Sequence, residues 1–166
     1  MASGNSQEII NYKQEAISRI INSDIIVEAL DARHEDGTPM DVEELYYTHI
    51  FPYGYIPGLI DKAGCYIALE VSMPKVSTAN YFFKDILLTI YIICHQDFMK
   101  TDYGATRIDY ISVALDKLFN GKKGMGTTEM TLVSNTEAPM DTVHRARVMR
   151  FQTTDVKKSL CFREDE

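Results

Sequence analysis

The sequence has no tryptophan, few cysteines, no long hydrophobic run and no excess of positive charge. Its 17 Lys and Arg residues are outnumbered by 24 Asp and Glu residues, which gives a net charge of −7 and disfavours a free-standing nucleic-acid binder. No apolar run reaches the roughly 18 residues of a membrane span, and the polar start MASGNSQE does not resemble a signal peptide. Cys65, Cys94 and Cys161 are odd in number and lack metal-binding spacing, so we interpret them as reduced thiols.

Motifs for catalysis and for ligand binding are also missing. The histidines are scattered without zinc-binding spacing, and they are His34, His49, His95 and His144. The run NGKKGMGTT follows a predicted helix and lacks the GK[ST] ending of a phosphate-binding loop, which precedes its helix. The acidic run over 36–44 lacks the register of an EF-hand, and no G-x-S-x-G elbow exists. The sequence therefore predicts no enzyme activity, no metal and no cofactor.

The most apolar stretch is YFFKDILLTIYIICH, from Tyr81 to His95, and its β-branched and aromatic residues predict a strand. With a period of two, one face is fully apolar and consists of Ile86, Leu88, Ile90, Ile92 and Cys94. The other face is mixed and consists of Asp85, Leu87, Thr89, Tyr91 and Ile93. Such a strand spans roughly 50 Å, whereas the usual strand has about 5–6 residues. We therefore expect either a bend or a mixed face that another molecule covers.

The remaining pattern predicts one α+β domain, in which an antiparallel β-sheet of two hairpins has helices packed on one face. The predicted segments within 1–166 are helical 7–30, a long loop or arm at 31–63, a hairpin at 64–97, a helix at 105–120, a hairpin at 127–154 and a tail at 155–166. In the second hairpin we expect strands over 129–133 and 142–152, joined by a turn in SNTEAPMD. A slip of the apolar phase after Val148 predicts a β-bulge in the later strand.

Three groups of residues are predicted to form interfaces: the aromatic residues of the arm, residues of the long strand, and the arginines of the last strand. The arm at 31–63 is far longer than the usual connection of about 4–6 residues and carries five aromatic residues, which either anchor an interface or simply pack over the sheet. Three arginines on the last strand either face a phosphate backbone, pair with acidic residues of a neighbouring copy, or are solvated. The predicted interface residues are Tyr46, Tyr47, Phe51, Tyr53, Tyr55, Phe82, Phe83, Leu87, Tyr91, Arg145, Arg147 and Arg150.

The last third of the chain carries a family resemblance. TDYGATRIDYISVALDKLFNG, then MTLVSNTEAPMD, then VHRARVMRFQTTDV resemble the small neck proteins of long-tailed bacteriophages, which include the tail terminator or head–tail joining protein. The shared layout is a helix that ends in a small turn, a strand with a polar turn, and an Arg-containing strand that runs into a charged end. The first helix followed by a hairpin also fits, so the likeness covers about residues 7–156.

The resemblance implies a structural virion protein, assembled in the host cytoplasm, that forms a ring at the neck. Such a ring, commonly a hexamer, terminates the tail tube and joins it to the head connector, and double-stranded DNA only passes through its lumen. An acidic chain suits that passage because like charges repel. Two alternatives remain open at this point: a head-closure, connector or tail-tube protein, and a small cytosolic enzyme or ligand-binding domain with a Tyr-rich lid.

Overall fold

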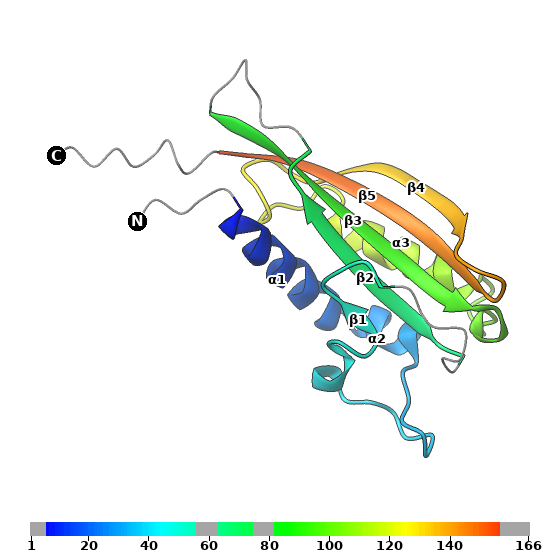
Figure 1. Ribbon diagram of the computed structural model, residues 1–166. Coiled ribbons are helices and arrows are strands. Elements are labelled where there is room, and N and C mark those ends of the chain that lie inside the picture. Colours follow the sequence, from blue (N-terminus) through cyan, green and yellow to red (C-terminus); the bar gives the residue numbers. More distant parts are fainter. Residues whose placement is uncertain (1–5, 56–62, 75–81, 157–166) are drawn as a thin grey trace.

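Strand β3, Phe83–His95, is the central strand in the computed structural model of the chain, which describes residues 6–55, 63–74 and 82–156. The sheet order is β1-β2-β3-β5-β4, with β1 at Ile50–Phe51, β2 at Cys65–Ser72, β4 at Thr131–Pro139 and β5 at His144–Val156. β1 runs parallel to β2, and the other three neighbouring pairs are antiparallel (Figure 1). The predicted α+β class is confirmed. Cys161, the tip between β2 and β3, residues 56–62 of the arm and most of the predicted tail lie outside the described residues.

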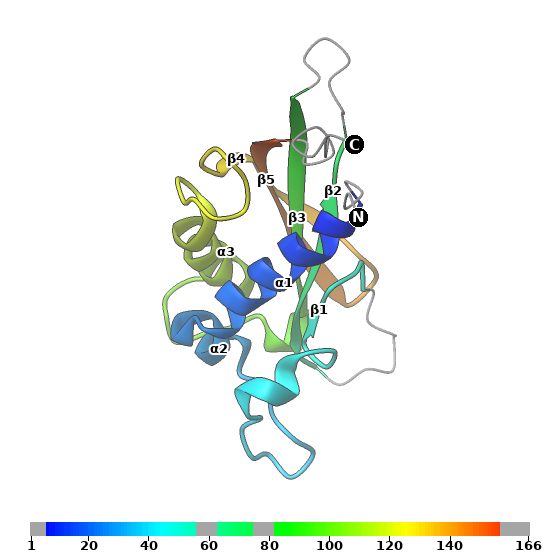
Figure 2. The ribbon, with the colours of Figure 1, turned by 90° about the vertical axis from the view of Figure 1, so that its left-hand side faces the viewer.

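All three α-helices lie on one face of the sheet, as Figure 2 shows. They are α1 at Gln7–Ile21, α2 at Asp24–Leu30 and α3 at Arg107–Phe119, and two short 3-10 helices are η1 at Val42–Leu45 and η2 at Gln96–Phe98. The Thr106 hydroxyl caps α3 by accepting a hydrogen bond from the Asp109 N–H at 3.3 Å. Gly121 follows α3 with φ of 70°, the left-handed conformation that commonly ends a helix.

The main core lies between this helical layer and the apolar face of β3. The five β3 residues of that face are fully buried, as predicted, and they are Ile86, Leu88, Ile90, Ile92 and Cys94. α1 contributes Ile17 and Ile20 to the same cluster, and α3 contributes Ile111, Leu115 and Phe119. Burial of each such side chain is worth about 1.5–3 kcal/mol, so this layer dominates the stability of the fold.

The second hairpin differs from the prediction in two ways. β4 continues to Pro139, so the turn predicted within 134–141 was wrong in extent and the actual connection is only 140–143. β4 is an edge strand, which tolerates turn-forming residues and a terminal proline because only one of its sides is paired. The predicted bulge in β5 was also wrong, because β5 pairs with β3 without interruption. The register shift lies in β4 between Leu132 and Ser134, which leaves Val133 outside the register.

The outer face of the sheet, opposite the helices, is covered at one end by the chain's own arm. Phe51, Tyr66, Ala68, Ile93 and Ala146 form a second buried cluster there. This cluster explains the apolar phase slip along β5, because side chains on both of its faces are buried. The mixed face of β3 is therefore covered in part by this chain rather than wholly by another molecule.

A buried polar cluster joins the start of α1 to the end of the sheet where β3 begins and β5 ends. Glu8 forms an ion pair with Lys84, and the two residues are 3% and 1% exposed. Lys84 lies opposite Asp155 in the β3–β5 register, and the Tyr12 hydroxyl donates a hydrogen bond to the Asp155 carboxylate. The cluster fixes how α1 crosses the sheet.

Candidate interaction surfaces

The arm is held by its own short-range contacts. η1 begins with the Asp41 N–H donating to the Glu44 carboxylate at 2.8 Å, and the same carboxylate lies 3.0 Å from His34 Nε2. Leu45, the last residue of η1, is 1% exposed and anchors the arm to the core. The Tyr47 N–H then donates to the Ile50 carbonyl at 2.9 Å. The aromatic residues that follow are thus carried on a fixed backbone.

The five aromatic residues of the arm divide into two groups. Phe51 is 4% exposed, and its ring stacks on Tyr55 with centroids 3.8 Å apart, so these two pack over the outer face of the sheet. Tyr46, Tyr47 and Tyr53 are 38%, 56% and 45% exposed. Phe51 and Tyr55 therefore pack over the sheet, and the prediction of an interface rests on Tyr46, Tyr47 and Tyr53.

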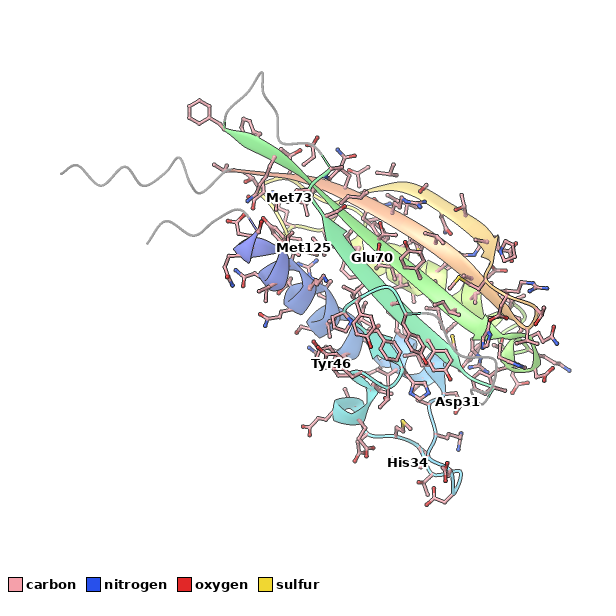
Figure 3. The ribbon with its side chains drawn as sticks, in the orientation of Figure 1. Asp31, His34, Tyr46, Glu70, Met73 and Met125 are labelled. Carbon is pink, nitrogen blue, oxygen red and sulfur yellow. The ribbon has the colours of Figure 1, made fainter. Side chains whose placement is uncertain are left out.

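The three exposed tyrosines lie together over the first half of α1. Ring centroids are 4.4 Å apart for Tyr46 and Tyr47, and 6.2 Å apart for Tyr47 and Tyr53. With α1 they form a hollow of about 470 Å³, which we call the aromatic hollow, lined by Ile10, Lys13, Gln14, Tyr46, Tyr47, Pro52 and Tyr53. Tyr46 marks it in Figure 3.

One ring of the aromatic hollow is carried on a strained backbone. Tyr47 has φ of 65°, a left-handed conformation that is unfavourable for a bulky residue. Partial burial, and then the hydrogen bond with Tyr47, raise the pKa of Tyr46 above its ordinary value. The hollow can take up an apolar side chain, and its phenol groups can hydrogen-bond to polar atoms beside that side chain.

Sequence reasoning missed the contribution of α1 to this hollow. Ile10 is a large apolar residue within the segment predicted as helical, 7–30, yet it is 50% exposed. Adjacent residues lie about 100° apart around a helix, and Ile10 lies at the border of the buried face of α1.

The uncovered part of the outer face has a paired polar region around Glu70 and exposed aromatic residues at the start of β3. The Tyr91 hydroxyl donates to the Glu70 carboxylate at 3.3 Å, and burial followed by the Glu70 charge raises the pKa of Tyr91. Glu70, labelled in Figure 3, lies on β2 beside Tyr91. Leu87 is half-buried between its neighbours on β2 and β5. Phe82 and Phe83 lie at the start of β3 and are 63% and 39% exposed.

The three predicted arginines do not form one row. Arg147 pairs with Asp109 of α3 at 2.5 Å and donates to Asn135 at 3.1 Å, so its partners belong to this chain. Arg145 donates to the Asp141 carbonyl at 2.9 Å. Arg150 lies on the opposite face of β5, because side chains alternate along a strand and its number differs from the other two by an odd step.

The histidines lie apart from one another, with one exception. His144 is fully buried, its Nδ1 lies 2.8 Å from the Asp141 carboxylate, and its ring meets that of His95 edge-on at 5.2 Å. His49 stacks on Tyr66 with centroids 5.2 Å apart, and burial lowers its pKa. In the part of the chain that the structure describes, no three His, Cys, Asp or Glu residues gather to hold a metal ion. Over the same residues, no helix is long and apolar enough to cross a membrane.

Comparison with known proteins gives matches to solved structures and a match to a family model. No curated protein sequence matches the chain. Among solved structures, a chain of the "Virion of native gene transfer agent (GTA) particle" has a TM-score of 0.54 at 12% identity, with 89% of this chain and 97% of that chain covered. At that identity the match shows a shared fold. The family model YomW matches residues 15–153. The chain therefore belongs to the YomW family, which is associated with bacteriophages.

Proposed function

We propose that this chain is a structural protein of a phage or phage-like virion, and that it forms a ring at the head–tail neck. In this role the ring, a hexamer, terminates the tail tube and joins it to the head connector, while DNA passes through its lumen. The observation that carries the proposal is the fold shared with a chain of a gene transfer agent virion, over nearly the full length of both chains. Membership of the phage-associated YomW family supports the same class.

The surfaces of the molecule agree with assembly into a ring. A closed ring needs a heterologous interface, in which one patch of a subunit meets a different patch on the next copy. The aromatic hollow is one such patch, because it exposes four large apolar side chains together, namely Ile10, Tyr46, Tyr47 and Tyr53. The net charge of −7 suits a lumen that must not retain DNA.

Native mass measurement and electron microscopy of the purified protein, alone and with isolated tail tubes, test the proposal. We expect closed rings, either free or formed on the tube end, and virions that lack the protein should have tails of abnormal length or tails without heads. Long stacked tubes from the protein alone would identify a tail-tube protein instead. Monomers that ignore tail tubes, together with normal tails in virions that lack the protein, would refute the structural role.

A further inference from the structure

We propose that the aromatic hollow receives the β4 edge of a second copy of this chain, with Val133 as the inserted side chain. The proposal rests on the ring of the preceding section and names the two patches that meet in it. Val133 is 55% exposed and lies at the register shift of an edge strand. A β-bulge re-aims the side chain of the extra residue, which makes Val133 a protruding apolar group.

The two patches lie at opposite edges of the molecule. Figure 1 shows β4 at one edge of the sheet, and α1 with the arm at the other. Opposite edges cannot meet within one chain, but they meet between successive copies in a head-to-tail arrangement. A hollow on one edge and a protruding valine on the other are therefore the two halves of one heterologous contact.

The chemistry of the two patches is complementary. Lys13 is the one charged residue that lines the hollow, while the only charged residues from 127 to 139 are Glu129 and Glu137, both exposed. No strand of this sheet pairs with the outer side of β4, where the Leu132 N–H donates to the Asn120 side chain at 3.1 Å, and tyrosine hydroxyls can donate to backbone carbonyls along this edge. A tyrosine-lined hollow thus suits an edge strand, because the rings can pack against the apolar side chain and the hydroxyls can donate hydrogen bonds to the backbone carbonyls.

The bulge also argues against a different way of joining two copies. Continuous pairing of β4 with another strand needs an unbroken edge, and bulges are one of the devices that prevent edge-to-edge pairing. The shift at Val133 interrupts the regular edge near its start. Insertion of a side chain into a hollow needs no continuous ladder, so it fits this edge better than β-augmentation does.

Site-directed cross-linking tests the contact directly. In a Cys161→Ser background, whose remaining Cys65 and Cys94 are fully buried, Ile10→Cys protein is mixed with Val133→Cys protein and treated with a short bismaleimide. We expect a heterodimer from the mixture and a ladder of oligomers from the double variant. The matched control replaces Val133→Cys with Ile25→Cys, because Ile25 on α2 is 54% exposed and lies outside the hollow. Heterodimers at the control's level would overturn the contact.

Charge and size changes give a second, independent measurement. Val133→Asp should weaken association at least about tenfold, whereas Ile25→Asp should leave it unchanged, because central apolar anchors carry most of the energy of an interface. Lys13→Glu and Glu137→Lys should each weaken association, and the double variant should recover it. Rings that persist in Val133→Asp, with no cross-link from Ile10→Cys, would overturn this contact while leaving the proposed function standing. Failure of the wild-type protein to associate, with or without tail tubes, would remove both.

Discussion

Replacement of Lys84 by Met should destabilise the folded chain strongly, and more than replacement of its partner. Lys84 is 1% exposed, and its ammonium group is the cation that faces both Glu8 and Asp155. Lys84→Met leaves two carboxylates near one another with their common counter-charge gone. Removal of one partner from a buried ion pair costs about 3–5 kcal/mol, which is a large part of a typical stability of about 5–15 kcal/mol.

The partner variant Glu8→Gln should cost less, about 1–2 kcal/mol. Its amide carbonyl can still accept a hydrogen bond from the ammonium group, and Lys84 keeps Asp155 across the β3–β5 register. A double variant, Glu8→Leu with Lys84→Met, should recover much of the loss, because well-packed apolar side chains often replace a buried pair without net cost. This geometry therefore predicts a larger loss of stability for Lys84→Met than for Glu8→Gln.

Urea unfolding at a protein concentration where the native mass is that of a monomer measures these differences as shifts in midpoint at constant slope. The matched control is Arg33→Met, whose ion pair with Asp31 at 2.9 Å lies at the surface and should contribute at most about 1 kcal/mol. A loss below about 1 kcal/mol for Lys84→Met, or a larger loss for Glu8→Gln, would refute the reasoning. Either result would mean that water reaches the pair or that Glu8 has a second partner in solution.

Three further predictions concern the arm and the acid limit of stability. Tyr47→Gly should keep the monomer's free energy of unfolding within about 1 kcal/mol of wild type, because relief of the left-handed backbone offsets the entropy of glycine, yet native mass should show association lost. Phe51→Ala should cost about 2–4 kcal/mol in urea unfolding, whereas Tyr53→Ala should cost less than about 0.5 kcal/mol, and equal losses would contradict the division of the arm. Burial acts to raise the pKa of Asp155, but hydrogen bonds led by that from Tyr12 outweigh burial and lower it below 3.8. This stabilisation is full above pH about 4 and is lost as the pH falls through the lowered pKa, so the difference between wild type and Tyr12→Phe should shrink in acid.

The elements that sequence predicted well are those with strong local periodicity. The alternation from Ile86 to Cys94 assigned the buried face of β3, and the apolar stripe of 106–119 located α3, because each pattern repeats over several turns or residue pairs. Both hairpins followed from the order of apolar runs and turn residues. These features are determined by residues that are close together in the sequence, so a local sequence pattern is enough to predict them.

The features that sequence missed depend on contacts between distant residues. β1 has only two residues, Ile50 and Phe51, and it exists as a strand because Ile67 and Ala68 lie beside it. The full length of β4 likewise depends on pairing with β5, which overrides the turn preference of its Ser and Asn residues. The position of the bulge depends on that pairing as well. None of these carries a local signal strong enough to compete with its turn-forming residues.

We propose the arm, rather than the mixed face of the long strand, as the favoured assembly surface. The mixed face of β3 is half apolar, so burial of its apolar residues needs a cover. Ile93 at one end is already covered by Phe51 and Tyr66, and the Tyr91 hydroxyl is hydrogen-bonded to Glu70. The polar part of that face around Glu70 would gain little from a partner, since its polar groups already have partners that a new contact would have to desolvate. The aromatic hollow has a fixed backbone and exposed rings, so a partner there removes apolar surface from water at a small cost in ordering.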